Sequence, residues 1–236
     1  QADEVALLSQ QRAAHARSEG YFASIVPVQN QVKQITVAQD ECIRADTSLE
    51  SLASLPAAFA TIGSRGVDAL QLKTHAGLAC INHIHTAGNS PAMADGAALL
   101  LLGDEKLGAA LGIKPRARII DAATASCDPL QVLSGCVAAT GKLMQRQELT
   151  AADLDLFELH EAFAATVVKC EQDLDIPRDK LNVNGGVIAL GHPMGATGAI
   201  MAGTLLDELE RRGQRRGIVA ASGAAGAGSA LLIERL

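Results

Sequence analysis

A single histidine stands within a run of glycines near the C-terminus, in the segment NVNGGVIALGHPMGATGAI that runs from Asn182 to Ile200. Glycine tolerates backbone shapes and close approaches that a side chain would forbid. A glycine-rich turn between a strand and a helix is therefore often built around a ligand. We expect Gly191-His192-Pro193 to direct the imidazole of His192 toward that ligand. A buried histidine satisfied by backbone carbonyls is the structural alternative.

Two further segments carry polar or glycine-rich residues at predicted junctions. They are HEAFA (160–164) and AASGAAGAGSALLIER (220–235). Ligands of open α/β sheets bind at such junctions. A dinucleotide-binding loop is rejected, because neither GHPMGATG nor GAAGAG fits G-x-G-x-x-G after a strand with a downstream acid, and GAAGAG precedes a predicted strand.

The elements that must position these segments follow from the apolar pattern. Helices are predicted over 3–19, 95–112 (capped by Asp95), 128–147 (opened by Pro129), 161–174 and 195–213 (ended by Gly213), with short helical segments near 48–55 and at 150–153. Strands are predicted over 21–28, 33–39, 116–125 (buried), 154–160, 217–222 and 229–236, and the last two are expected to pair. A further strand is expected to start at Lys180. A loop is predicted after Pro56 as far as residue 81. Strands alternating with helices indicate α/β layers with a mixed sheet.

Composition and charge exclude several classes of protein. The 236 residues are 48% hydrophobic and 19% charged with a net charge of −6, as in an ordinary globular chain. The basic cluster Arg211, Arg212, Arg215 and Arg216 is too small for a nucleic-acid surface. It is expected to complement a helix dipole, and attraction of a phosphorylated cofactor is the alternative.

Cysteine usage and hydropathy bear on the compartment. Five scattered cysteines without CxxC spacing argue against a disulfide framework or a zinc site, and for a reducing compartment. His83 and His85 alternate along the chain like metal ligands, but no third ligand has a matching spacing, so we expect no metal. No apolar run reaches the length of a membrane span.

The motifs together resemble the thiolase family. NVNGG…LGHPxGATG, followed by a long helix and GIVAAS…GxG…LLIER, is highly specific to the thiolase C-terminal domain. HTAGNSPAMADGAALLLL (85–102) resembles the family's TAGN…DGA segment, and QQRAAHARSEGYFASIVPV resembles the end of its inserted loop domain. The resemblance implies a thiolase-like layered α/β fold, with a mixed sheet and helices on both faces, whose N-terminal half is absent from this sequence. Residues 1–92 would be the remainder of the loop domain and a connecting segment, and 93–236 the C-terminal domain.

The resemblance implies roles for particular residues. Thiolases cut 3-ketoacyl-CoA through a cysteine thioester, and the nucleophilic cysteine belongs to the missing half. His192 would lower the pKa of that thiol and stabilise the thioester enolate oxygen, with Gly191 in support. His160 stands where most thiolases have the Asn of NEAF, and HEAF resembles the β-subunit thiolases of trifunctional β-oxidation complexes. It would serve oxyanion stabilisation, with Glu161 in support; a solvent-facing histidine at a strand end is the alternative.

The sequence departs from the family at two places. Ser222 stands where thiolases have a second cysteine as acid/base, and a hydroxyl has too high a pKa for that task. The substitution implies either a natural paralogue with weakened or altered activity or an engineered trap, although the N–H of Ala224 would still contribute to an oxyanion hole. Pro91 replaces a serine that touches pantetheine. This leaves Ser90 and Phe163 as the expected CoA contacts.

The sequence therefore predicts a thiolase-type acyltransferase with no permanently bound cofactor and with coenzyme A and acyl-CoA as substrates. Family membership implies a homodimer or homotetramer, or part of a β-oxidation complex. It also implies a cytoplasmic location, or the mitochondrial matrix or peroxisome in a eukaryote. The alternatives are a non-catalytic acyl-CoA-binding protein of thiolase fold and a structural partner subunit completed by another chain.

Overall fold

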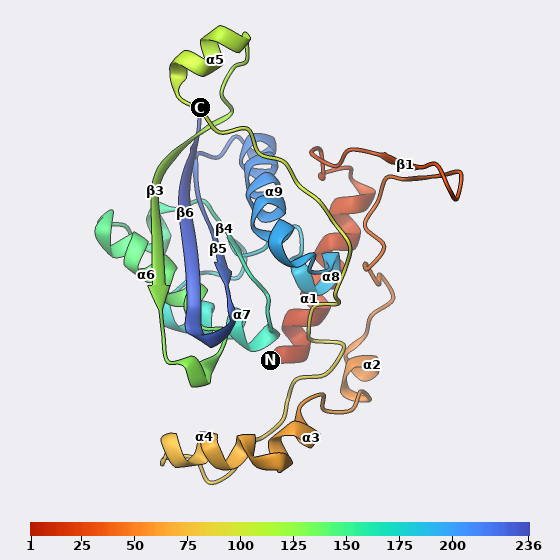
Figure 1. The fold of residues 1–236 in the computed structure, drawn as a ribbon, viewed down its shortest axis with the longest axis vertical. Coiled ribbons are helices and arrows are strands. Elements are labelled where there is room, and N and C mark those ends of the chain that lie inside the picture. Colours follow the sequence, from red (N-terminus) through yellow and green to blue (C-terminus); the bar gives the residue numbers. More distant parts are fainter.

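A four-stranded mixed sheet forms the centre of the molecule, which the computed structural model describes over residues 1–236 (Figure 1). The sheet order is β3 (Ala117–Ser126), β6 (Ala227–Arg235), β5 (Arg216–Ser222) and β4 (Leu156–Leu159). β6 is antiparallel to β3 and β5, whereas β4 and β5 are parallel. The helices are α1 (Ala2–Ser18), α2 (Leu49–Ala53), α3 (Ala60–Ile62), α4 (Asp68–Thr74), α5 (Glu105–Leu111), α6 (Gly135–Arg146), α7 (Ala164–Asp173), α8 (Val187–Leu190) and α9 (Thr197–Arg212).

Helices cover both faces of the sheet, as expected. Successive residues of a strand point to opposite faces. Phe157 and Ile218 face the larger core, to which α6 and α7 contribute. Leu156 and Val219, one step along the same strands, pack against Leu205 and its neighbours on α9. α6 and α9 therefore lie on opposite faces of the sheet (Figure 1).

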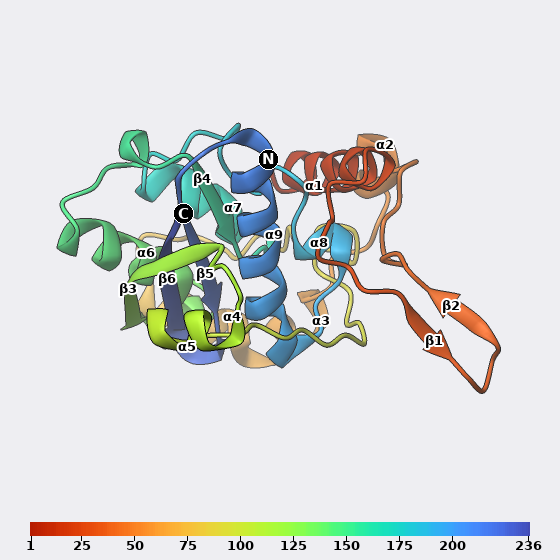
Figure 2. The ribbon, with the colours of Figure 1, turned by 90° about the horizontal axis from the view of Figure 1, so that it is seen from above.

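The first helix lies beside the sheet, against α7 and α8. The guanidinium of Arg12 donates to the carbonyls of Leu181 at 2.6 Å and Arg178 at 2.8 Å. After α1 the chain leaves the body as a hairpin of β1 (Val28–Asn30) and β2 (Ile35–Val37), which projects away from the sheet (Figure 2). No helix combines the length and the apolar character that crossing a bilayer requires.

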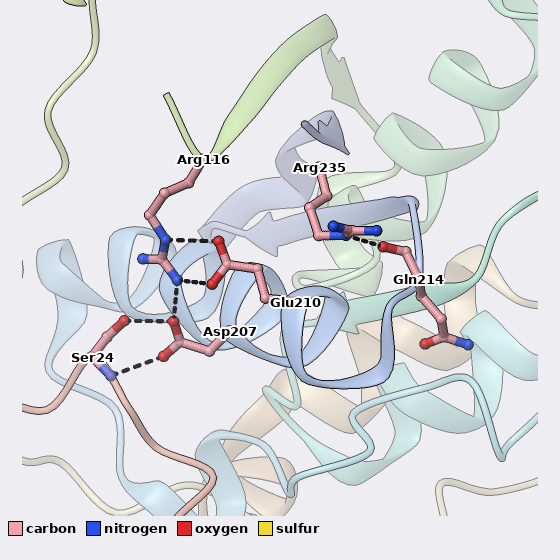
Figure 3. A network of polar contacts seen from close by, with 6 residues as sticks. All are labelled: Ser24, Arg116, Asp207, Glu210, Gln214 and Arg235. Atoms are coloured by element: carbon pink, nitrogen blue, oxygen red, sulfur yellow. Dashed lines mark hydrogen bonds and ion pairs between the residues drawn. The ribbon is translucent and has the colours of Figure 1, made fainter. Parts of the chain in front are cut away.

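A polar network ties the segment after α1 to the outer side of α9 (Figure 3). The N–H and hydroxyl of Ser24 donate to the two carboxylate oxygens of Asp207, at 2.9 and 2.8 Å. Arg116, just before β3, donates to Asp207 at 2.6 Å and to Glu210 at 2.9 Å and 2.6 Å. This network joins three segments that are distant in the sequence.

Most elements of the C-terminal half match the sequence prediction. The strands at 154–160, 217–222 and 229–236, the β5–β6 pairing and the helical turn Ala151–Asp153 are all present. α9 ends as predicted, because Gly213 adopts a left-handed conformation with φ 65°. The predicted strand from Lys180 is reduced to a single bridge between Leu181 and Phe157. The predicted helix 161–174 starts later, at Ala164.

The predicted helix over 95–112 is wrong for most of its length. Only α5 is helical, and Asp104 caps it in place of Asp95, accepting a hydrogen bond from the Leu107 N–H at 2.8 Å. The leucines at 99–102 are contiguous and all exposed, Leu99 to 95%. Helices in proteins are stabilised mainly by packing an apolar face, and this segment finds no face to pack against.

Four further expectations also need correction. The predicted strands at 21–28 and 33–39 shrink to the three-residue β1 and β2. The helix predicted over 128–147 breaks at Val132, whose φ is +54°, into a short turn and α6. β3 is present, but it is the edge strand and mostly not buried. The predicted loop after Pro56 contains α3, a π-helical turn (Gly63–Val67) and α4.

Candidate functional site

The end of β4 places His160 in the interior. Its N–H donates to the carbonyl of Ala220 on β5 at 3.0 Å, which continues the parallel ladder by one residue. By strand alternation, its side chain lies on the face of Leu156, which α9 covers. His160 is only 3% exposed, and neither ring nitrogen has a hydrogen-bond partner. The structure thus does not support a solvent-facing histidine.

The loop between α8 and α9 carries His192. Its N–H donates to Ala92 at 2.8 Å, and its carbonyl accepts from the N–H of Ala94. Gly191 has φ +89°, and a Cβ there would lie 2.8 Å from the Cβ of Ala94 and 3.1 Å from the Sγ of Cys42. Only glycine fits this turn. The residues after the TAGN segment therefore hold the histidine loop on one side.

The two histidines face each other. Their ring centroids lie 4.6 Å apart with an interplanar angle of 54°. Burial, and secondly the neighbouring His192, lower the pKa of His160 to about 4. Burial also lowers the pKa of His192. At neutral pH both rings are neutral, so each has one nitrogen that can accept a proton and one N–H that can donate.

Glu161 does not join this pair but braces the loop behind it. Its carboxylate accepts hydrogen bonds from the hydroxyl of Ser9 at 2.7 Å, from Nδ2 of Asn182 at 3.0 Å and from the N–H of Ile188 at 3.1 Å. Burial raises its pKa. A Cβ on Gly186 would lie 2.3 Å from the Glu161 carboxyl carbon, so the NGG glycine makes room for this carboxylate. The contacts favour the supporting role predicted for Glu161.

Ser222 lies at the same sheet edge as His160 but directs its hydroxyl elsewhere. β4 and β5 are parallel, so residues after both strands meet at one edge. The Ser222 hydroxyl donates to the Leu133 carbonyl at 2.7 Å and accepts from the Cys136 N–H at 2.9 Å. It therefore ties β5 to the start of α6. Ala224 opens the exposed turn that follows.

The expected CoA contacts, Ser90 and Phe163, come together through Asn89. The Asn89 carbonyl accepts from the N–H of Ala164 at 3.2 Å, which joins the residue before Ser90 to the residue after Phe163. The Ser90 hydroxyl is buried without a partner. The Phe163 ring packs against Phe59 at 5.4 Å and His85 at 5.2 Å. Polar and aromatic groups suited to a flexible chain thus lie near each other.

The other polar clusters from the sequence are accounted for within the chain. Arg211 and Arg212 pair with Glu208, and Arg215 and Arg216 pair with Glu234. These pairs leave the arginines engaged by carboxylates, which disfavours a phosphate-binding role.

The two histidines of the possible metal pair have separate partners. His83 contacts Asp68 at 2.9 Å, whereas His85 contacts Asn89 at 3.3 Å. The alternation of His83 and His85 therefore does not create a shared ligand site.

Sequence reasoning missed several residues that shape the site. Thr197, the first residue of α9, contacts Nδ1 of His192 at 2.7 Å. Ser9 and Asn182 hold Glu161. Phe59 extends the aromatic group at Phe163. The GATG motif and the NVN motif contain Thr197 and Asn182, but Ser9 and Phe59 come from distant segments whose contacts no local pattern indicates.

Comparison with known proteins agrees with this layered α/β fold. The profile of the thiolase C-terminal domain matches residues 113–235, and that of the thiolase N-terminal domain matches residues 1–69. An acetyl-CoA acetyltransferase of Synechocystis sp. is 41% identical, over 99% of this chain and 55% of its own. The peroxisomal 3-ketoacyl-CoA thiolase A of Mus musculus is 40% identical, over 98% of this chain and 52% of its own.

Two crystal structures share the fold. The Bacillus anthracis acetyl-CoA acetyltransferase superposes with a TM-score of 0.84 at 36% identity, covering 100% of this chain and 55% of that chain. Human mitochondrial 3-ketoacyl-CoA thiolase gives 0.83 at 32% identity, covering 99% and 55%. The chain belongs to the thiolase family, and it spans about half the length of the relatives it matches. The domain boundary expected at residue 92 stays a prediction.

Proposed function

We propose that this chain forms the histidine-bearing half of a thiolase-type acyltransferase. The reaction is the CoA-dependent cleavage of a 3-ketoacyl-CoA, or the reverse Claisen condensation, through a cysteine thioester. The observation that carries the proposal is the pair formed by the buried His160 and the partly buried His192, whose rings lie 4.6 Å apart. The nucleophilic cysteine would come from the half of the fold outside these residues.

His192 would act as the base in this reaction. A neutral imidazole takes the proton of the nucleophilic thiol, and the thiolate attacks the 3-keto carbon. The bond between the α and β carbons then breaks, leaving the acyl group on sulfur and releasing the enolate of acetyl-CoA, which takes up a proton. A second thiol, that of CoA, loses its proton and attacks the thioester to release the shortened acyl-CoA.

His160 would stabilise negative charge on oxygen. Its ring is buried and neutral and makes no well-formed hydrogen bond within the chain, although the Ser222 backbone lies nearby, so its N–H can donate to a substrate oxygen. Fixed donors in a water-excluded site stabilise a developing oxyanion more strongly than water does. Ser90 and Phe163 would contact the pantetheine chain. The backbone at Gly191 and Ala224 would shape the oxyanion pocket.

Ser222 supports a second candidate, a non-catalytic acyl-CoA-binding or structural subunit. Its hydroxyl is already hydrogen-bonded at 2.7 Å and 2.9 Å to backbone groups. A serine is in any case too weak an acid to exchange the protons that a second thiol would handle. Turnover would then be weakened, altered or absent.

The substrates, pathway and compartment of the proposed enzyme are inferred from its relatives. CoA and acyl-CoA would be substrates, with no permanently bound cofactor. The relatives include a peroxisomal and a mitochondrial thiolase. We therefore extend the proposal to fatty-acid β-oxidation by a homo-oligomer or a β-oxidation complex. The compartment would be the cytoplasm, the mitochondrial matrix or the peroxisome.

The proposal is tested in a fusion protein that supplies the N-terminal half of the thiolase fold. The chain is fused behind the N-terminal half of the Bacillus anthracis acetyl-CoA acetyltransferase, and thiolysis of acetoacetyl-CoA is followed by the loss of its enolate absorbance. We expect turnover that falls at least 100-fold in His192→Ala, the usual contribution of a general base. Ser222→Cys should raise the rate. A folded fusion that binds CoA but turns over in neither form would establish the non-catalytic alternative.

A further inference from the structure

We propose that Thr197 is a positioning residue whose hydroxyl lets His192 alternate between its two neutral tautomers. The inference rests on the proposed function, which requires this histidine both to accept a proton and to donate one. Oγ1 of Thr197 lies 2.7 Å from Nδ1 of His192. Thr197 is 3% exposed, and its hydroxyl has no other hydrogen bond.

The fold leaves the His192 ring with few other constraints. The main-chain N–H and carbonyl of His192 are both hydrogen-bonded, to Ala92 and Ala94 of one neighbouring segment. Its side chain has one polar contact with the protein, the Thr197 hydroxyl. Thr197 is itself fixed as the first residue of the 16-residue α9, on the face of the sheet that His160 also occupies. The hydroxyl thus sets the orientation of the ring relative to His160.

The chemistry of a hydroxyl suits a histidine with two tasks. A hydroxyl both donates and accepts. When Nδ1 carries the proton, Oγ1 accepts it and Nε2 keeps a lone pair that can take a thiol proton. When Nε2 carries the proton, the hydroxyl rotates and donates to Nδ1, so Nε2–H can donate to an enolate oxygen. A carboxylate or a carbonyl could only accept, and would hold the proton on Nδ1.

The surroundings favour a change of tautomer over a lasting positive charge. His192 lies at the N-terminus of α9, where the helix dipole disfavours a cation. The buried ring of His160 lies 4.6 Å from the ring of His192. Thr197 adds no negative charge that would offset these effects. A neutral ring with a reversible partner is therefore the arrangement that the site accommodates.

The test measures the tautomer directly. The 236-residue chain is labelled with ¹⁵N-histidine, and long-range ¹H–¹⁵N spectra give the protonation of each ring nitrogen. For the wild type we expect His192 resonances between the protonated and unprotonated limits. In Thr197→Val, which keeps the shape but removes the hydroxyl, a buried Nδ1–H would lack an acceptor, so the proton should move to Nε2 and the resonances should separate.

Matched variants separate this role from helix packing. Thr197→Ser keeps the hydroxyl and should restore the wild-type resonances, and Thr197→Ala serves if the valine variant does not fold. Thr204→Val, further along α9, is the control and should change nothing at His192. Unchanged His192 resonances in Thr197→Val, or equal changes in the serine and valine variants, would overturn the inference. The NMR experiment needs neither CoA nor turnover. Its result is therefore independent of whether the fused enzyme of the preceding test is active.

Discussion

Two regions of the chain treat their aliphatic side chains in opposite ways. In residues 113–236 most of these side chains are buried between the sheet and its helices, as for Leu205 at 2% exposure and Ile218 at 0%. In residues 20–112 many remain in water, with Val32 at 93% and Leu99 at 95%. Both regions are apolar in sequence. The difference shows that apolar content predicts an element only where the chain also supplies a surface to cover it.

The functional residues divide in the same way. His160 follows a sheet strand, and His192 precedes a helix that packs on that sheet. The geometry of His160 is therefore set by the well-packed region, whereas the main chain of His192 is also held by Ala92 and Ala94 from the loosely packed region. Phe59 and His85, whose rings pack against Phe163, belong to the loosely packed region. We expect His160 to be held more rigidly than the aromatic group at Phe163.

The largest expected effect is a core truncation in the packed region. Leu205→Ala removes a side chain that lies between α9 and the sheet. Such a cavity costs about 2–5 kcal/mol of unfolding free energy. Urea denaturation followed by circular dichroism measures it. A loss below about 1 kcal/mol would mean that α9 is not tightly packed on the sheet.

Acid should weaken the same region through His160. Its pKa is about 4 in the folded chain, against about 6.5 for a free imidazole. The folded state thus resists protonation, so this contribution is complete above pH ~6.5 and is lost as pH falls toward 4, on the order of 3 kcal/mol in total. His160→Asn should flatten this part of the stability profile. Parallel profiles for the two proteins would contradict a buried neutral ring.

Removing the Ser222 hydroxyl should give a smaller loss. Ser222→Ala leaves the Leu133 carbonyl and the Cys136 N–H without their partner. An unsatisfied backbone group costs about 1–3 kcal/mol. Ser126→Ala, at an exposed serine whose side chain makes no hydrogen bond, is the control for denaturation experiments. Equal stability of the two variants would show that Ser222 does not brace α6.

The smallest effect is expected for Leu99→Ala. Its side chain is 95% exposed, so truncation removes almost no packing. The unfolding free energy should change by no more than about 0.5 kcal/mol. Leu99→Ala and Leu205→Ala remove the same atoms, so the difference between their stability losses reports the difference in burial. A loss approaching that of Leu205 would break the contrast between the two regions.

The elements that the sequence predicts correctly lie mostly in the well-packed region. β4, β5, β6 and α9 were predicted because their apolar periods match faces that the sheet and helices cover within this chain. The helix over 95–112 failed because Leu99 to Leu102 carry no such partner, and propensity alone does not hold a helix in water. Val132, with φ +54°, broke another predicted helix in a way its residue type does not signal.

The sequence indicates residues of the candidate site only where a local motif contains them. The glycine-rich turn around His192 and the HEAF segment each indicate a candidate histidine, because each motif is short and contains the histidine itself. The hydrogen bonds of Ser222 were not foreseen, since they depend on how α6 packs against β5. Ser9 lies 152 residues from the Glu161 that it contacts, a separation that no sequence pattern spans.

The most direct test of the account is a double-mutant cycle on the histidine pair. In the fused enzyme, kcat/KM is measured for His160→Ala, His192→Ala and both together, with His75→Ala, at the end of α4, as control. Residues that act as one unit give losses that do not multiply. We predict that the double variant is no slower than the poorer single variant. Fully multiplied losses, or single variants as active as the control, would contradict a shared site.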